Sequence, residues 1–273
     1  MKKIGVVVKP DHPDCDGVTK KLVDWLRQNK KEVALIDPRK GHRIPPVDMI
    51  VVLGGDGTLL SVARRIEKQN VPILAVNLGS LGFLTEVKYD EIYPTLDRVF
   101  RGQFLEDTRQ MLACVVRRGQ KAYPQPAVLN EVTVNSGPSA KLIRMEISID
   151  HQFVTALRAT GVIVSTATGS TAYTLSAGGP ILYPSVEALV LTPISAHMLS
   201  QRSIVVPSNA NVHVALKTAE RGAVATFDGQ QVTPLMPDDV VEIRSAKTRL
   251  KLIRSPHRNY YQVLREKLHW GEG

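Results

Sequence analysis

The apolar residues of this chain follow two different periods, and the change between them near residue 103 is the feature that most constrains the fold. In the first hundred residues, short apolar runs typical of buried strands alternate with segments that have the spacing of amphipathic helices. The predicted strands cover 2–8, 32–37, 48–53 and 71–77, and the predicted helices cover 18–31 and 91–102. This order predicts a mostly parallel α/β sheet, which binds ligands at the carboxyl ends of its strands.

After residue 103 the apolar residues follow a period of two. In LIRMEISID, Ile143, Met145 and Ile147 fall on one face of a strand, and charged residues fall on the other. The same alternation recurs in VHVALK, VVEIRS and RLKLIR. We therefore expect a mainly β region, with one helical insertion around 171–177.

These patterns predict two domains. Residues 1–103 would form a Rossmann-like α/β domain, and residues 104–254 would form a β-rich domain. The last segment, 255–273, has a helical pattern that we expect to pack back on the first domain. No internal repeat and no low-complexity tract interrupts this organisation.

Composition limits the class of protein. A chain of 273 residues with 43% hydrophobic and 22% charged residues is globular and long enough for about two domains. No run approaches the 18 apolar residues of a membrane span, and the start is too short for a signal peptide, so we expect a cytoplasmic protein. Cys15 and Cys114 lie far apart without metal-ligand spacing, which favours buried thiols over a disulfide framework or a zinc site.

The net charge of +9 raises the alternative of a nucleic-acid-binding protein. Most of the basic excess lies in 241–273, where Arg and Lys alternate with Leu250, Leu252 and Ile253 as in a strand with one solvated face. Only 5% of the residues are aromatic, which disfavours binding of nucleic acid by base stacking. A polyanionic small molecule would be attracted by the same positive field.

The stretch LGGDGTLLS at 53–61 follows a predicted strand and precedes a predicted helix. Its glycines, Gly54, Gly55 and Gly57, permit a sharp turn and a close approach of the backbone to a ligand, and Thr58 is the expected helix cap. Such a loop binds phosphate at a helix N-terminus, where the carboxylate of Asp56 would repel it unless that carboxylate has a chemical role. The alternative is a tight, capped turn without function.

Several other chemistries are excluded by spacing. The dinucleotide fingerprint GxGxxG fails because Leu60 stands where the third glycine is needed, and no P-loop occurs. The seven histidines include no HExxH, and neither GSTAY nor SAGGP forms the GxSxG turn of a nucleophilic serine.

Three segments resemble the signatures of NAD kinases, the ATP-dependent enzymes that phosphorylate NAD to NADP. They are LGGDGTLL at 53–60, NEVTV at 130–134 and STATGSTAYTLSAGGPI at 165–181. GGDG alone is also similar to 6-phosphofructokinases and to diacylglycerol and sphingosine kinases, whereas the GSTAY stretch is far more specific. The resemblance implies an α/β domain and a β-rich domain with the active site in the cleft between them.

The resemblance implies a catalytic role for Asp56, as the base that deprotonates the 2′-hydroxyl of the adenosine ribose while it attacks the γ-phosphate of ATP. The glycines of the loop would hold the phosphates, and magnesium would arrive with ATP rather than on protein ligands. Phe83, in LGFL, would close over the ligand, with core packing as the alternative.

The resemblance also implies which residues bind NAD. Asn130 and Glu131 match a pair that contacts the nucleoside, and their amide and carboxylate suit a base edge and ribose hydroxyls. The remaining residues matched to the dinucleotide are Gly57, Thr171, Ala172, Tyr173, Thr174, Leu175, Ser176, Lys141, Arg158, Thr160, Asp228 and Gln230. Without the resemblance, each could be structural: a strand-entry turn, a loop of small residues or a solvated cation. The resemblance also implies a homo-oligomer, either dimer or tetramer, in which Lys141 and Arg158 would come from a neighbouring subunit.

Two positions depart from the family pattern. Thr160 stands where an aspartate is common, and Ala167 replaces a proline. Threonine brings no charge, so the contact of Thr160 to the nicotinamide end and the preference for NAD over NADH stay open. Whether polyphosphate can replace ATP as the donor also stays open. A related lipid or sugar kinase, or a dinucleotide-binding regulator without turnover, remains an alternative function.

Overall fold

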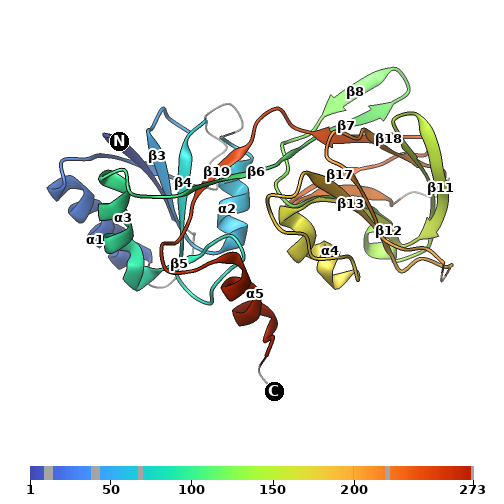
Figure 1. Cartoon of the computed structure of the whole chain (residues 1–273). Helices are drawn as coiled ribbons and strands as arrows, with labels where there is room; N and C mark the ends of the chain where they lie inside the picture. Colours follow the sequence, from blue (N-terminus) through green and yellow to red (C-terminus); the bar gives the residue numbers. More distant parts are fainter. Residues whose placement is uncertain (9–14, 38–43, 67–69, 199, 219–221, 272–273) are drawn as a thin grey trace. The chain divides into compact units, whose positions relative to one another are not determined.

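A computed structural model of the chain describes residues 1–8, 15–37, 44–66, 70–198, 200–218 and 222–271 (Figure 1). The chain divides into two compact units. The first consists of residues 1–108 and 250–273, and the second consists of residues 109–249.

The first unit is built on one sheet with the strand order β2-β1-β3-β4-β19-β6, and β5 pairs with β4. Its strands are β1 (Lys3–Val8), β2 (Glu32–Ile36), β3 (Met49–Leu53), β4 (Pro72–Asn77), β5 (Val87–Lys88), β6 (Glu106–Arg109) and β19 (Leu250–Ile253). β1 pairs in parallel with β2 and β3, and β4 pairs in parallel with β3, β5 and β19. β3 is buried along its whole length, as in a parallel sheet covered on both faces. The predicted α/β sheet is confirmed.

Helices α1 (Cys15–Gln28) and α3 (Ile92–Phe100) of the first unit share an apolar core with this sheet. The unit also contains α2 (Asp56–Ala63), the 3-10 turn η1 (Tyr89–Glu91) and α5 (Tyr260–Leu268). In α3 the buried residues Ile92, Leu96 and Val99 recur every three or four positions and belong to the same core cluster as Leu22 of α1. Gly102, with a φ of +74°, follows the last turn of α3, as predicted for a glycine that ends a helix.

Helix α2 begins one turn earlier than the sequence suggests. Its N-cap residue is Gly55, and no side chain caps it. Thr58 lies inside the first turn, where its amide donates to the carbonyl oxygen of Gly55 at 3.0 Å, so the predicted capping role of Thr58 is wrong. A glycine cap has no side-chain oxygen that would compete with an anion for the first amides of the helix.

The second unit contains two six-stranded sheets. Their strand orders are β11-β10-β15-β18-β7-β8 and β14-β13-β12-β9-β16-β17. The strands of the first are β7 (Leu112–Arg118), β8 (Lys121–Pro124), β10 (Ile143–Ile149), β11 (Gln152–Ala159), β15 (Val212–Leu216) and β18 (Val240–Ser245). Those of the second are β9 (Glu131–Asn135), β12 (Gly161–Thr166), β13 (Ala188–Ile194), β14 (Ile204–Pro207), β16 (Val224–Phe227) and β17 (Gln231–Pro234). Three short helical turns, η2 (Gly137–Ser139), η3 (Thr168–Thr171) and α4 (Tyr173–Ser176), interrupt them.

One apolar core lies between these two sheets. Met145 and Val214 from one sheet and Val132, Val164 and Phe227 from the other belong to a single cluster of buried side chains. In β10, buried residues alternate with the exposed Arg144 and Glu146, which confirms the predicted period of two. The β-rich region is therefore a sandwich of two antiparallel sheets.

Strand β19 differs from its expected place. Its alternating sequence suggests a member of the β-rich domain, but Lys251 and Leu252 pair in parallel with Pro72 and Ile73 of β4. A period of two does not reveal which sheet a strand will join, because the pairing depends on contacts distant in sequence.

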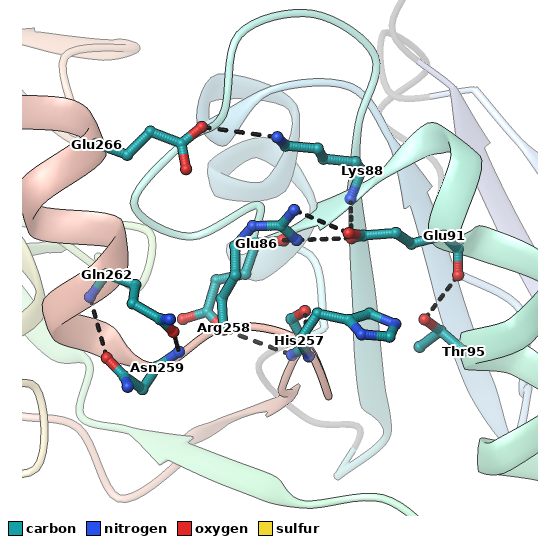
Figure 2. Close-up of polar contacts among 10 residues, drawn as sticks. Glu86, Lys88, Glu91, Thr95, His257, Arg258, Asn259, Gln262 and Glu266 are labelled. Carbon is teal, nitrogen blue, oxygen red and sulfur yellow. Dashed lines mark hydrogen bonds and ion pairs between the residues drawn. The ribbon is translucent and has the colours of Figure 1, made fainter.

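The C-terminal helix is attached to the first unit by side chains from the segment before α5 and from α5 itself (Figure 2). Asn259 caps α5: its side chain accepts from the amide of Gln262 at 3.0 Å, and Gln262 Oε1 accepts from the amide of Asn259 at 2.8 Å. Arg258 donates to both carboxylate oxygens of Glu91, at 2.6 and 2.8 Å, and to the carbonyl oxygen of Glu86 at 3.2 Å. Glu86 and Glu91 are thereby held from the C-terminal end of the chain.

We expect Arg258→Ala to lower the free energy of unfolding by about 1–3 kcal/mol, because the variant leaves the Glu91 carboxylate, whose side chain is only 18% exposed, without its bidentate partner. Urea unfolding of the full chain measures this loss. Glu266→Gln is the control, because the pair of Glu266 with Lys88 is about half exposed and 3.8 Å long, so its loss costs less than about 0.5 kcal/mol. Equal losses in the two variants would contradict the structural role of Arg258.

Candidate active site

The glycine loop joins the end of β3 to the start of α2, in the place expected from the sequence. A Cβ built at Gly55 would meet no other atom within 4 Å, so the outer side of this turn has room for a ligand. Asp56 is the first residue of the helix and is partly exposed. The loop therefore combines a helix N-terminus, which favours anions, with one carboxylate.

The carboxylate of Asp56 is bound by the second glycine-rich segment. Asp56 Oδ2 accepts from the amide of Phe83 at 2.9 Å. Asp56 Oδ1 accepts from the amides of Leu84 at 3.2 Å and Thr85 at 3.1 Å, and from Thr85 Oγ1 at 2.9 Å. A Cβ on Gly82 would overlap Asp56 Oδ1 and Thr85 Oγ1, so this close approach requires glycine. Four donors thus fix the orientation of this carboxylate.

Phe83 takes part in this arrangement through its backbone. Its ring, which the sequence suggests as a lid or a core residue, is partly exposed and lies 5.9 Å from Lys267 Nζ of α5. The ring is therefore not a core side chain.

In the second unit, Asn130 and Glu131 lie where β9 begins, on a turn held by Asp228. The Asp228 carboxylate accepts from the amides of Leu129, Asn130 and Glu131 at 3.0, 2.7 and 3.3 Å. Asp228 and Gly229 have φ values of +49° and +62°, as in the type I′ turn that favours Asp-Gly. Asp228 thus shapes the turn, while Gln230 closes it through its amide and keeps an exposed side chain.

Asn130 and Glu131 are buried but incompletely hydrogen-bonded. Asn130 Oδ1 and Glu131 Oε2 have no hydrogen-bond partner within the described residues. Burial, with the nearby charge of Asp228, raises the pKa of Glu131 to about 8, although the amide of Tyr173 donates to this carboxyl and opposes the change. Buried polar oxygens without partners are unusual, and a ligand with hydroxyl or amino donors would satisfy them.

The STATGSTAYTLS segment packs against the same turn. The Thr166 amide donates to the carbonyl oxygen of Asn130 at 2.9 Å, and Thr166 Oγ1 donates to that of Leu129 at 2.7 Å. A Cβ on Gly169 would overlap the backbone of Asn130, so the two segments touch only because residue 169 is glycine. These contacts bring the TAY run and the Asn-Glu pair into one site.

Within the TAY run, the residues are exposed to different degrees. Tyr173 is 44% exposed, Ser176 is also exposed, and Thr171, Ala172 and Leu175 are partly buried. Thr174 is fully buried, so its side chain belongs to the support of the loop. An exposed tyrosine ring beside a buried amide and carboxyl suits a planar ring with polar edges.

Lys141, Arg158 and Thr160 lie apart from the Asn-Glu pair. Thr160 precedes β12 at the end of its sheet opposite Glu131, Arg158 lies in β11 of the other sheet, and Lys141 lies between η2 and β10. Gly161 pairs with Asn135, at the end of β9 opposite Glu131, and four residues of strand separate the two ends by about 13 Å. Arg158 and Lys141 are exposed. Thr160 Oγ1 donates to the carbonyl oxygen of Ile194 at 3.0 Å, a bond that an ionised aspartate at this position would lack. The structure does not bring these three residues to the Asn-Glu pair.

Two absences hold for the described parts of the chain. No group of three or more His, Cys, Asp or Glu side chains is arranged to hold a metal ion there. No helix in those parts is long and apolar enough to cross a membrane. Cys114 is a free, buried thiol, and burial raises its pKa to about 12, whereas the side chain of Cys15 lies outside the described residues.

A cavity of about 590 Å³ lies in the first unit away from the glycine loops, lined by residues of α3 and by Arg254, His257 and Arg258. Arg254 and Arg258 are already paired with Glu86 and Glu91. The candidate site of the first unit is therefore the glycine loop and not this cavity, and the candidate site of the second unit is the Asn-Glu turn.

Comparisons with known proteins agree on one family. The ATP-NAD kinase N-terminal domain matches residues 39–104, and the ATP-NAD kinase C-terminal domain matches residues 129–255. A protein of Syntrophotalea carbinolica named NAD kinase is 46% identical, and one of Geobacter metallireducens with the same name is 42% identical; both alignments cover all of each chain. The chain belongs to the NAD kinase family.

Solved structures of the NAD kinase family have the same fold. An NAD kinase from Archaeoglobus fulgidus, solved with ATP, has a TM-score of 0.81 and 26% identity and covers 97% of this chain and 99% of its own. Yeast NADH kinase, solved with NADH, has a TM-score of 0.92 at 23% identity, with 100% and 89% of the two chains covered.

Two residues that the sequence analysis did not single out lie in the hydrogen-bond network of Asp56. Asn77 and Thr85 are buried, and together they complete the hydrogen bonding around Asp56. Asn77 ends an otherwise apolar strand, and Thr85 follows the apolar LGFL. In the sequence, the only indication of their role is that each is a single polar residue beside an apolar segment.

The raised pKa of Glu131 predicts opposite pH dependences of stability and NAD binding. The folded chain binds the Glu131 proton more tightly than the unfolded chain does, so this stabilisation is complete below about pH 4.5 and disappears as the pH rises through about 8. Binding of ribose hydroxyls favours the ionised form, so we expect NAD affinity to increase roughly ten-fold between about pH 6.5 and 8.5.

Glu131→Gln tests both effects, because glutamine stays neutral. We expect this variant to melt above the wild type at pH 9 by more than at pH 5, and to bind NAD weakly without the pH dependence. Differential scanning fluorimetry and isothermal titration calorimetry measure these effects. Glu146→Gln, on the surface, is the control, with no pH-dependent gap. A wild type whose NAD affinity is flat across this range would contradict the assignment.

Proposed function

We propose that this chain transfers the γ-phosphate of ATP to the 2′-hydroxyl of the adenosine ribose of NAD, which yields NADP and ADP, with Asp56 as the general base. The observation that carries the proposal is the Asp56 carboxylate, which lies at the start of α2 within the glycine loop. Its Oδ2 accepts one hydrogen bond from the described residues, whereas its Oδ1 accepts three. Membership of the NAD kinase family supports this reaction over a lipid kinase, a sugar kinase or a regulator without turnover.

The proposed step moves one proton and one phosphoryl group. The 2′-hydroxyl gives its proton to Asp56 Oδ2 while its oxygen forms a bond to the γ-phosphorus, and the bond from that phosphorus to the β–γ bridging oxygen breaks. Phosphoryl transfer has a loose transition state, so aiming the hydroxyl matters as much as removing its proton. General-base assistance contributes about 10² to 10⁴ in rate.

The other predicted residues provide binding in this proposal. Gly54, Gly55, Gly57 and the first turn of α2, with Thr58, hold the phosphates of ATP. The unpaired Asn130 Oδ1 and Glu131 Oε2 accept hydrogen bonds from the nucleoside. Residues 171–176 flank it, with the exposed ring of Tyr173 available for packing on a base.

Magnesium belongs to the substrate in this proposal. Mg-ATP carries its own neutralising charge, which removes the repulsion between the triphosphate and Asp56.

We also propose that the protein acts in the cytoplasm, where ATP and NAD meet, as a homo-oligomer, either dimer or tetramer. The strands β11 and β14 are at sheet edges and carry exposed apolar residues, among them Phe153 (68%) and Val205 (50%). We expect light scattering to give two or four times the mass of the 30.0 kDa chain. Phe153→Lys should lower this mass, whereas a monomeric wild type would contradict the assembly.

The activity is tested by incubating the pure protein with Mg-ATP and NAD and detecting NADP with an NADP-specific dehydrogenase. We expect NADP only when the protein, NAD and Mg-ATP are all present. NADH as acceptor and polyphosphate as donor are added in parallel, because Thr160 leaves the acceptor preference undecided. A protein that binds NAD without forming NADP would be a regulator and not a kinase.

In the same assay we expect Asp56→Asn to lower kcat by about 10² or more and to leave NAD affinity within several-fold, since the base acts in the transition state. Asp48→Asn is the matched control. Asp48 also accepts two backbone amides in the first unit, those of Lys2 and Lys3, but lies outside the glycine loop, so its kcat should not change. Near-normal turnover of Asp56→Asn would remove Asp56 from the role of base.

A further inference from the structure

We propose that Asn77 and Thr85 are positioning residues that orient the carboxylate of Asp56, so that Oδ1 is held by the protein and Oδ2 receives the proton of the substrate hydroxyl. This inference rests on the proposed function. It assigns different tasks to the two oxygens of one carboxylate and names the buried side chains that separate them.

Three hydrogen bonds form a chain with one direction. The amide of Gly79 donates to Asn77 Oδ1 at 2.6 Å, which fixes the orientation of the Asn77 side chain. Asn77 Nδ2 then donates to Thr85 Oγ1 at 2.9 Å. Because this lone pair of Thr85 is taken, its hydroxyl hydrogen points to Asp56 Oδ1, 2.9 Å away.

The side chains that form this series of hydrogen bonds are buried up to Asp56. Thr85 has no exposed surface, and Asn77 is 5% exposed, so water does not compete for their donors and acceptors. Buried networks with every member satisfied hold their geometry rigidly. The network also joins the two glycine segments, because Asn77 precedes 79–82 and Asp56 lies in 54–57.

The two oxygens of Asp56 are unequal as a result. Oδ1 accepts from Thr85 Oγ1 and from the amides of Leu84 and Thr85, which leaves no free lone-pair direction for a further partner. Among the described residues, Oδ2 accepts one hydrogen bond, from the amide of Phe83 at 2.9 Å, and keeps room for one donor. A proton taken at Oδ2 leaves Oδ1 as an acceptor, so the network stays intact through the step.

Thr85→Val tests the inference, because valine keeps the shape and removes the donor. We expect kcat to fall about ten-fold while the KM values for NAD and ATP change less than three-fold, since the hydroxyl acts through the base and not on the bound substrate. The acidic limb of the pH profile of kcat should move to higher pH, because the ionised carboxylate has lost a donor. Thr85→Ser restores the donor and should stay within two-fold of the wild type.

Asn77→Asp is a second, independent variant. An aspartate cannot donate to Thr85 Oγ1, so the hydroxyl of Thr85 is free to turn away from Asp56, and we expect a fall in kcat at least as large. Thr95→Val is the matched control: Thr95 is equally buried in the first unit and donates to the carbonyl oxygen of Glu91 at 2.7 Å, so its loss affects stability without moving the pH profile.

The outcomes separate this inference from the proposed function. A wild type that forms no NADP overturns both. A wild type that forms NADP, with Thr85→Val unchanged in kcat and in its acidic limb, overturns only the positioning role. The same holds if Thr85→Ser is impaired as much as Thr85→Val, or if Thr95→Val shifts the profile equally, because the effect would then reflect packing.

Discussion

The hydrogen bonds between the Asp56 carboxylate and residues 83–85 are the constraint on which the first unit depends. They bring together two loops that follow neighbouring parallel strands, β3 and β4, and they require glycine at residue 82. Three amides and one hydroxyl donate to this carboxylate and fix its orientation beside the glycine loop. Because Arg258 holds Glu91, the C-terminal segment supports the same loop from its far end.

The second unit contains two neighbouring buried carboxyl groups that differ in their hydrogen bonding. Asp228 is buried and accepts three backbone amides, whereas Glu131, its neighbour, is buried with one oxygen unpaired. The first is a fixed charge that shapes a turn, and its field and the burial together raise the pKa of the second. Under the proposed function, donors from NAD would favour the ionised form of Glu131, which would link NAD binding to proton release.

The sequence predicted the fold class because periodicity is local. The parallel strands and the alternating strand 143–149 followed from residues a few positions apart. The place of β19 did not, because its pairing with β4 joins residues far apart in the chain. Likewise, GGDG indicated Asp56, but the donors to Asp56 come from a second loop, and no local pattern shows that Asn77, Thr85 and Asp56 meet.

Several buried polar atoms near the start of β9 have no hydrogen-bond partner among the described residues, which lowers the stability of the fold there. Ser165 pairs with Glu131 across two strands, and its hydroxyl, like that of Thr174, is buried without a partner in the described part of the chain. Together with Asn130 Oδ1 and Glu131 Oε2, these atoms surround the start of β9 and the TAY loop. Each unsatisfied buried group costs about 1–3 kcal/mol, and stable folds tolerate only a few of them. The hydroxyl groups of Ser165 and Thr174 have no exposed surface and belong to the support of this region. The unpaired oxygens of Asn130 and Glu131 are better explained by a ligand that supplies the missing partners than by packing alone, since packing could replace each side chain with an apolar one of similar size.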